Sequence, residues 1–500
     1  MKRFIRLLLC ALLSLFLLAG CAPSSPTPPE GGDNPGGTDT YEPIPSPPEG
    51  GDNPGGTDTY EPIPSYKYTI EYLGDDVFPI GAWMAPPYQN NVTPIPENYI
   101  TEQAYKDIAD SGINIIYALY DRCENTGDIT TERNQNVLKA LQYADKYGVA
   151  YFARDWNEMA LMEESDTQDM RILYDEFDKI PSFSGILVQD EPGLVHFDNL
   201  AQMKTNFDKY FEGKTFYTNM MPTYATDNQL NNGAASGGGN PSTIELYERY
   251  VDEFLDKVKP QLFSYDFYPM MNEFPNIESG YFRNMSIVAE KTAEAGIPFW
   301  TFIQSCSWGS NVRICNQAEI DWQVNTSLAY GAKGIQYFTY WTPYDDSGTN
   351  PGFYPSRTDE QIGSMVSHDG QKQDMYYRVQ KTNVNLVEVG KVLLDCGFAG
   401  IVQHGESPDE IPAQDLLTDF RQLKSVSGAD AIVGCFDRNG NTVLYVVNNS
   451  ILSERNNAQI SLQFEKSLSY EVTQNGQKTT GEGETLTLTL NAGEGALVCL

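Results

Sequence analysis

Two adjacent carboxylates follow an apolar run near the middle of the chain. The run 186–188 leads through Gln189 into Asp190 and Glu191, and Pro192 comes next. Proline lacks the backbone N–H that a strand needs, so it predicts that a strand ends at these carboxylates. In a parallel α/β fold the carboxyl ends of the strands carry the catalytic groups, and a carboxylate there can act as general acid or base. The alternative is that both acidic residues cap the following helix.

A second candidate carboxylate, Asp266, ends the apolar run 262–265 and is followed by Phe267 and Tyr268. Amide and aromatic side chains end most of the other apolar runs. Flat sugar faces pack on aromatic rings, and a pair of carboxyl groups can cleave a glycosidic bond. The residues that we expect to contact such a substrate are Trp83, Asp155, Trp156, Asp190, Asn219, Tyr268, Gln304, Trp308 and Trp341.

These candidates also have simpler interpretations. Trp83 and Trp341 could pack in a core, and Asp155 could cap a helix, as could Asp121 at another predicted strand end. Further residues that we place at strand ends are Arg154, Tyr344 and Asp345. If Asp266 is not the second carboxylate, the weaker candidates for that role are Asp155, Asp190 and Asp345.

Apolar runs alternate with amphipathic segments over residues 66–410, and this alternation would position the candidate side chains. Eight strand–helix units in one direction predict a (β/α)₈ TIM barrel. A doubly wound sheet would carry a glycine-rich turn after its first strand, whereas residues 84–88 read Met-Ala-Pro-Pro-Tyr. The predicted strands are 78–83, 113–120, 149–154, 183–191, 215–219, 262–268, 298–304 and 335–341. The predicted helices are 97–111, 131–147, 168–179, 199–211, 243–258, 281–295, 317–330 and 372–394.

The pattern changes after the barrel. From about residue 430 short alternating strands are separated by the hairpin signals Asn439-Gly440 and Asn475-Gly476. We therefore expect residues 411–500 to form an antiparallel β-sandwich with a structural role. Within the barrel, the Gly/Asn-rich segment 226–240 is predicted to be a long loop.

The first 65 residues predict a targeting signal followed by a linker. Lys2 and Arg3 precede an apolar run that ends in Leu18-Ala-Gly-Cys21, so residues 1–20 have the form of a secretory signal. Their end resembles the lipobox of bacterial lipoproteins, which implies lipid attachment at Cys21; the alternative is an ordinary secreted protein. Residues 21–65 contain two identical copies of a 19-residue Pro/Gly-rich repeat, which predicts a disordered linker. We expect a bacterial cell-envelope protein that is anchored to the membrane and faces outward.

Charge and residue usage exclude several partners. The formal net charge is -35, and no basic stretch exists that could neutralise phosphates, so we expect no nucleic-acid partner. His196, His368 and His404 are scattered and none ends a predicted strand, so we expect no metal and no cofactor. Cys306 and Cys315 could bridge or could remain free thiols. Oligomeric state is left open.

Several motifs resemble those of a known group of enzymes. Asp190-Glu191-Pro192 is similar to the Asn-Glu-Pro motif of the large clan of (β/α)₈ glycoside hydrolases that carry an acid/base glutamate after strand four. The stretch 323–341 resembles the strand-eight region of β-galactosidase-like barrels, and 493–500 resembles the last strand of β-domains appended to glycosidases. The resemblance covers residues 70–500. It implies that Glu191 is the general acid/base.

One position departs from that clan. Its nucleophile is a glutamate at the end of strand seven, where this chain has Gln304, which cannot ionise. The best substitute is Asp266, whose separation from Glu191 would predict inversion at about 6.5–9.5 Å and retention at about 5–5.5 Å. The sequence thus predicts a surface glycoside hydrolase that acts on a poly- or oligosaccharide through Glu191 and Asp266. The alternative, favoured by Gln304, is a non-catalytic glycan-binding lipoprotein with the same fold.

Overall fold

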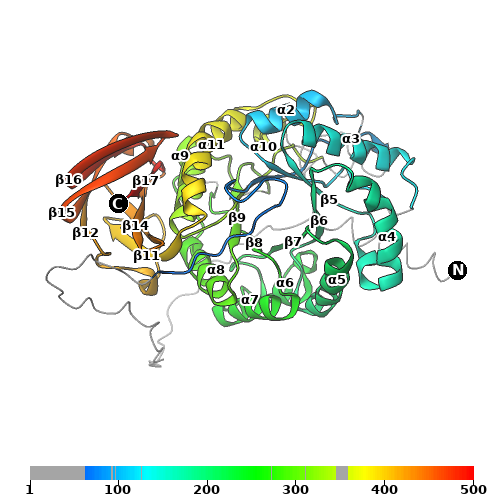
Figure 1. Ribbon diagram of the computed structural model, residues 1–500, viewed down its shortest axis with the longest axis horizontal. Helices are drawn as coiled ribbons and strands as arrows, with labels where there is room; N and C mark the ends of the chain where they lie inside the picture. The colour runs from blue at the N-terminus through cyan, green and yellow to red at the C-terminus, as the bar shows by residue number, and fades with distance from the viewer. Residues whose placement is uncertain are drawn as a thin grey trace.

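The computed structural model describes residues 62–91, 94–95, 97–124, 127–271, 273–309, 311–344 and 358–500. Eight parallel strands close into a barrel in the order β1-β10-β9-β8-β7-β6-β5-β4, and β4 pairs with β1 (Figure 1). This confirms the predicted (β/α)₈ fold. The barrel strands are β1 (Ile80–Trp83), β4 (Ile115–Tyr117), β5 (Ala150–Ala153), β6 (Phe183–Asp190), β7 (Thr215–Met220), β8 (Phe263–Asp266), β9 (Phe299–Gln304) and β10 (Ile335–Phe338).

Helices surround the barrel, and several of them begin at a side chain that caps the first turn. Thr131, Thr243 and Asn316 each accept a hydrogen bond from a backbone N–H in the first turn of the helix that follows. The helices are α2 (Glu102–Asp110), α3 (Glu132–Lys146), α4 (Glu164–Phe177), α5 (Phe197–Tyr210), α7 (Ile244–Val258), α8 (Tyr281–Ala295), α9 (Gln317–Ala329), α10 (Asp359–Ile362) and α11 (Asp374–Leu393). The short strands β2 (Asn90–Asn91) and β3 (Pro94–Ile95) pair in the loop after β1.

The segment 226–240 is more ordered than the sequence predicted. It contains the short helix α6 (Asp227–Asn232), followed by a 3₁₀ turn from Ala234 to Ser236. Thr226 and Gln229 form a capping box, in which each side chain bonds the other's backbone N–H. The prediction of a continuous loop was therefore wrong, because this capping box stabilises a helix too short to show an apolar stripe.

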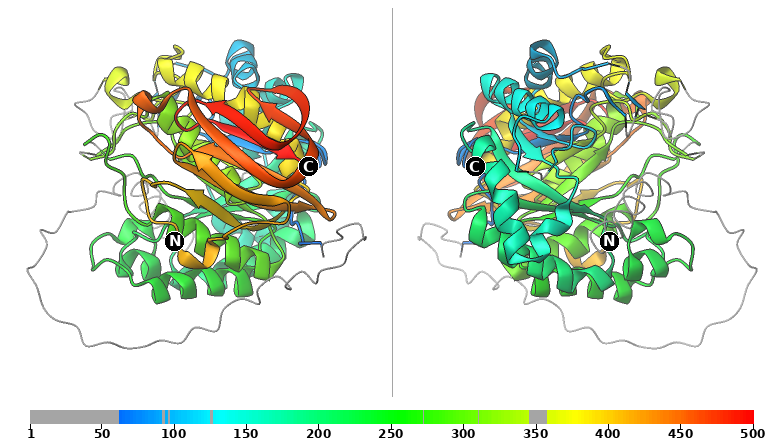
Figure 2. Two further views of the ribbon diagram at one scale, coloured as in Figure 1. Left: turned by 90° about the vertical axis from the view of Figure 1, so that its left-hand side faces the viewer. Right: turned by 90° about the vertical axis from the view of Figure 1, so that its right-hand side faces the viewer.

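Seven antiparallel strands form one sheet at the C-terminal end, seen face-on in Figure 2. The strands are β11 (Gly397–His404), β12 (Leu423–Gly428), β13 (Ala431–Arg438), β14 (Asn441–Asn448), β15 (Ala458–Gln474), β16 (Gln477–Leu490) and β17 (Gly495–Cys499). β15 spans 17 residues, so its first part pairs with β12 and its second part with β17. The sheet encloses an apolar core of its own. β11 precedes residue 411, where the sequence placed the start of this domain.

The sheet packs on the outside of the barrel against α9. Eleven α9 residues are buried, and the helix lies between the barrel and strands β13 and β14. The indole of Trp322 donates to Asn449 (2.8 Å), the amide of Asn325 donates to Gly493 O (2.8 Å), and Tyr445 donates to Asn325 Oδ1 (2.6 Å). The two parts therefore share a hydrogen-bonded interface on the barrel's flank.

Three further observations concern the expectations about thiols, membranes and the linker. Cys306 and Cys315 are free thiols, as are the other cysteines that the structure describes. In the described part of the chain, no helix combines the length and the apolarity needed to span a membrane. Ser65, at the end of the expected linker, donates to Leu394 O (2.9 Å), whereas Cys21 and residues 22–61 lie outside the described residues.

Candidate active site

Three carboxyl groups meet at the mouth of the barrel. Asp190 ends β6, Glu191 follows it, and Asp266 ends β8, with β7 lying between these two strands. The carboxyl groups of Glu191 and Asp266 lie close enough to perturb each other's pKa. Asp266 is 6% exposed, whereas Asp190 and Glu191 are partly exposed. The fold thus brings together the two carboxylates that the sequence nominated, and solvent reaches them.

Burial and mutual repulsion hold protons on this group. Burial, reinforced by the charges of Asp266 and Asp190, raises the pKa of Glu191 well above its ordinary value. Burial and the Asp190 charge raise the pKa of Asp266 to about 8, against an opposing hydrogen bond from Tyr268. Burial raises the pKa of Asp190 only to about 6, because the Arg154 guanidinium opposes it. Asp190 therefore ionises at lower pH than Asp266, and the negative charge of either one favours the protonated form of Glu191.

The backbone at Glu191 is held in an uncommon conformation. Its φ is 46°, in the left-handed region that non-glycine residues seldom occupy. Its N–H donates to Asn219 O (2.8 Å) on β7, and its carbonyl accepts from Ala234 N–H (3.1 Å) in the loop after β7. The Tyr250 hydroxyl donates to Pro192 O (2.7 Å). Contacts on both sides of Glu191 thus fix a turn that aims its side chain toward Asp266.

A chain of buried hydrogen bonds supports the site from below. In the barrel interior the Gln336 amide donates to Ser264 Oγ (2.9 Å), and Ser264 donates to Asn219 Oδ1 (3.0 Å). Tyr117 and Tyr217 both donate to Gln336 Oε1. Since the Asn219 oxygen already accepts from Ser264, its NH₂ group is the part left to stabilise the charged Asp190 carboxylate, whose pKa Asn219 lowers. The layer under the carboxyl groups thereby fixes the orientation of Asn219.

Aromatic rings form one wall of the site. The Tyr268 side chain hydrogen-bonds Asp266, and its ring lies 4.7 Å from Trp308 and 5.4 Å from Phe338, centroid to centroid. Trp308 and Phe338 are themselves 5.3 Å apart, and both are partly exposed. A sugar ring that reached the carboxyl pair would meet these aromatic surfaces. Tyr268 and Trp308 were expected at the site from the sequence.

Several expected site residues lie elsewhere, beginning with Gln304. Its side chain is fully buried, and its amide accepts from Met270 N–H (2.9 Å) and donates to Met270 O (3.1 Å) and Arg313 O (2.8 Å). Backbone groups on two loops thus engage the whole amide. Gln304 therefore clamps the loops after β8 and β9 and does not face the substrate side of the mouth.

Asp155 and Trp156, like Gln304, are engaged by the protein itself and do not face the substrate side of the mouth. Asp155 is fully buried, accepts from Asn157 N–H (2.8 Å) and lies against Cys123, and burial raises its pKa to about 7. Arg122 and Arg133 lie over the Trp156 ring, each 4.9 Å from its centroid, so the protein's own cations occupy the ring expected to stack on sugar. Asp155 therefore organises its own loop by accepting from the backbone two residues on; it does not cap the helical turn that follows, whose N-cap is Asn157.

Trp83 and Trp341, from the first and last predicted barrel strands, are packed inside the protein. Trp83 is 4% exposed and contacts Tyr117 and Phe302, and Trp341 is 2% exposed and contacts Tyr99 at 5.0 Å. These placements match the core-packing alternative.

Asp121 is also fully buried and accepts from the Tyr151 hydroxyl. Tyr344 is 2% exposed and donates to His368 O (2.7 Å), and Asp345 lies outside the described residues.

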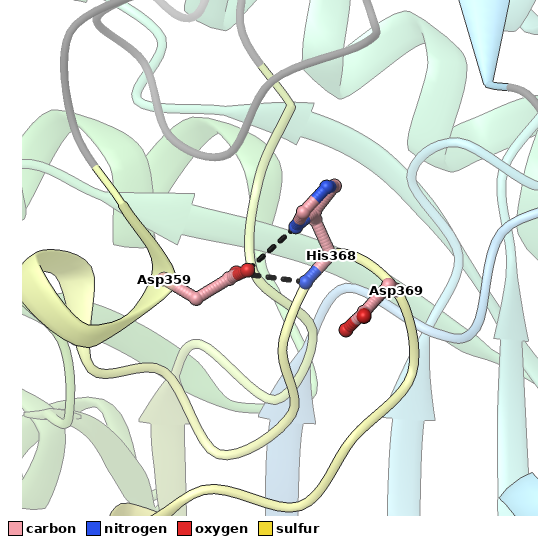
Figure 3. A group of neighbouring side chains, drawn as sticks. All are labelled: Asp359, His368 and Asp369. Carbon is pink, nitrogen blue, oxygen red and sulfur yellow. Dashed lines mark hydrogen bonds and ion pairs between the residues drawn. The ribbon is translucent and has the colours of Figure 1, made fainter.

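A cluster of possible metal ligands lies in the connection between β10 and α11. Asp359, His368 and Asp369 place ligand atoms within 4.8 Å of one another among the described residues (Figure 3). The Asp359 carboxylate already bonds both the His368 ring at Nδ1 (2.6 Å) and the His368 backbone N–H (2.9 Å). These bonds account for the cluster's geometry, so we assign it the role of holding this loop.

Three residues of the site were not assigned to it from the sequence. Phe338 was hidden inside an apolar strand, and Tyr250 lies on α7, where only its long-range bond to Pro192 reveals its role. Arg154 stood at a predicted strand end but was given no role. Its position beside acidic residues was the signal that could have included it.

Comparisons with solved structures find glycoside hydrolases at low similarity. A family 39 glycoside hydrolase from the gut symbiont Bacteroides cellulosilyticus WH2 is 12% identical with a TM-score of 0.46, over 88% of this chain and 83% of its own. A family 30 subfamily 8 xylanase from Clostridium acetobutylicum is 12% identical with a TM-score of 0.43, over 87% and 97%. No model of a known protein family matches, nor does any curated protein. At this similarity the function must be argued from the chain's own side chains.

Proposed function

We propose that this protein is a glycoside hydrolase in which Glu191 is the general acid/base and Asp266 its partner carboxylate. The observation that carries the proposal is the proximity of these two carboxyl groups, one fully and one partly buried, beside an aromatic wall. Cleavage of a glycosidic bond needs one protonated and one ionised carboxyl group. The charges of Asp266 and Asp190 raise the pKa of Glu191, so an ionised carboxylate beside it favours the protonated form of Glu191.

The short spacing favours a double displacement. Neighbouring carboxyl groups whose charges act on each other fit the short separation of a retaining pair better than the wide one that admits the water of an inverting enzyme. In the first step Asp266 attacks the anomeric carbon while Glu191 gives its proton to the departing oxygen. In the second step Glu191 takes a proton from water, which attacks the same carbon and releases Asp266. The sugar therefore leaves with its original anomeric configuration.

The test is hydrolysis of a panel of plant, fungal and host glycans by the purified protein. We expect Glu191→Gln and Asp266→Asn each to lower kcat/KM by roughly two to four orders of magnitude. The matched control is Asp321→Asn, since Asp321 is a buried aspartate with a raised pKa on α9, bonded to Thr382 rather than to the site. NMR of the first anomer released reports the stereochemistry. Activity that survives both site substitutions would exclude the pair, and binding without hydrolysis would favour the glycan-binding alternative.

We further propose that the protein is a lipoprotein of the bacterial cell envelope, facing outward. The support is the sequence Leu18-Ala-Gly-Cys21 after a basic and apolar segment, together with the Pro/Gly-rich repeats that follow it. Metabolic labelling with a radioactive fatty acid tests this proposal. Label should enter the unmodified chain and not the Cys21→Ser variant, and equal labelling of both would refute it.

A further inference from the structure

Arg154 is a buried cation for which the described residues offer no ion-pair partner. It follows β5, the strand beside β6, and its side chain is 2% exposed. Its Nε is buried and has no hydrogen-bond partner. Among the residues that the structure describes, no carboxylate lies within ion-pair distance of its guanidinium. Burying an unpaired charge costs several kcal/mol, so this arrangement calls for a group that completes it.

A second arginine lies close to the first. Arg122 follows β4, is partly buried, and its Nε donates to Leu119 O (3.0 Å), with its guanidinium over the Trp156 ring. Burial, with the Arg154 charge added to it, lowers the pKa of Arg122, and the Glu158 charge opposes that shift. Such a pair is unexpected in a chain with 33 basic and 68 acidic side chains, because acidic partners are abundant.

The arginine pair borders the catalytic carboxyl groups. The Arg154 charge acts on Asp190, which stands next to Glu191, although it forms no ion pair with it. Glu158 acts on Arg122 through its charge in the same way, and among the described residues no ion pair joins either carboxylate to either arginine. Arg133, the second arginine over Trp156, has its own weak partner in Glu124 at 3.9 Å. In the described part of the chain, Arg154 and Arg122 thus lack a carboxylate at ion-pair distance on the side of β4 and β5.

We propose that Arg154 and Arg122 form a subsite for an anionic group of the substrate, either a uronic acid carboxylate or a sulfate ester. The inference rests on the proposed hydrolase function and narrows its substrate class to acidic glycans. A guanidinium presents a planar fork of N–H donors that matches a carboxylate or sulfate with two parallel hydrogen bonds. Such a group would supply the partners that Arg154 lacks.

Equilibrium binding to the full chain tests the subsite without requiring turnover. The probes are oligogalacturonate and its methyl ester, and a sulfated galactan oligosaccharide and its desulfated form, measured by calorimetry. We expect one acidic probe to bind about 10- to 100-fold more tightly than its neutral partner, the range for charge-assisted hydrogen bonds. Whether the carboxylate or the sulfate pair shows the preference identifies the anion.

Variants tie the preference to these side chains. Arg154→Gln should abolish the preference with little change for the neutral probe, and Arg154→Lys should retain part of it, because the charge remains while the planar fork is lost. Arg249→Gln on α7, a 60% exposed arginine paired with Glu253, controls for the loss of one positive charge. Since the described residues offer Arg154 no ion-pair partner, its removal should leave the thermal midpoint unchanged or higher, and Arg122→Gln provides an independent variant of the subsite.

The possible outcomes separate this inference from the hydrolase proposal. Equal binding of acidic and neutral probes, no binding of any probe, or an unchanged preference in Arg154→Gln would each overturn the subsite. A preference that persists in a protein without hydrolytic activity would overturn the hydrolase proposal alone. Hydrolysis of neutral glycans with no acidic preference would overturn the subsite alone.

Discussion

The stability gained by replacing Asp266 with asparagine, measured against the unmodified protein, should be greater at pH 8 than at pH 5. Burial raises the pKa of Asp266 from 3.8 to about 8, so the folded state holds a proton that the unfolded chain releases. For an acid whose folded pKa is raised, the free energy of unfolding falls as pH rises from the unfolded pKa to the folded one. Asparagine does not titrate, so the variant escapes this loss.

The magnitude follows from the pH interval. Between pH 5 and 8 the folded Asp266 stays largely protonated while the unfolded one is ionised, which costs up to about 1.4 kcal/mol per pH unit, or roughly 4 kcal/mol over the interval. Glu191 adds to the effect, because removal of the Asp266 charge lowers its pKa as well. The difference in unfolding free energy between variant and unmodified protein should therefore grow by a few kcal/mol.

Urea unfolding, followed by tryptophan fluorescence at each pH, measures this difference without any substrate. Asp256→Asn, at an exposed aspartate of α7, controls for the loss of one carboxylate. A stability difference that stays constant from pH 5 to 8 would refute the reasoning, since it would mean that Asp266 ionises alike in the folded and unfolded states. Functional residues often carry such a stability cost.

Three further predictions concern the same site. Asp190→Asn removes a charge that raises the pKa of Asp266, so the acid limb of the kcat/KM profile should move to lower pH; an unmoved limb would contradict this coupling. Gly193→Ala should lower kcat at least tenfold with the fold retained by circular dichroism, because a Cβ there would lie 2.2 Å from Gly233 N and displace the turn after Glu191; unchanged kcat would show that the turn tolerates the shift. Gln304→Ala should cost about 2–4 kcal/mol of unfolding free energy by leaving buried backbone groups unpaired, and Gln304→Glu should be no better, since a carboxylate would face two carbonyl oxygens; a stable, active Gln304→Glu variant would argue against the clamp.

The barrel could be predicted because each of its strands is a short apolar run followed by an amphipathic helix. β11 and β12 could not, for two different reasons. β11 follows α11 after only a short turn, and its pairing partner β13 lies about 30 residues later in the chain. β12 has largely exposed side chains and so lacks the alternation that marks a half-buried strand. Both are stabilised by partners that local sequence does not reveal.

The candidate site was predictable in part for a related reason. A strand end places a residue at the barrel mouth but does not say where its side chain points. Glu191 and Asp266 lie near each other because only one strand, β7, stands between β6 and β8. The strand order of the predicted barrel implied this arrangement. Gln304 turns toward loops at residues 270 and 313, and Asp155 toward Cys123, and these contacts depend on loop conformations that the sequence pattern does not encode.

The position of α9 between barrel and sheet has a consequence for how the protein is made. Its outer face is covered by β13 and β14, and Asn325 is tied to Gly493, more than 160 residues further along the chain. While a ribosome is still synthesising those strands, the barrel is present but the outer face of this helix is uncovered, and Trp322 and Asn325 lack their hydrogen-bond partners. Nascent chains at that stage should be the ones that chaperones hold and proteases remove. A truncated chain that lacks residues 397–500 would keep every catalytic candidate, but we expect it to express poorly.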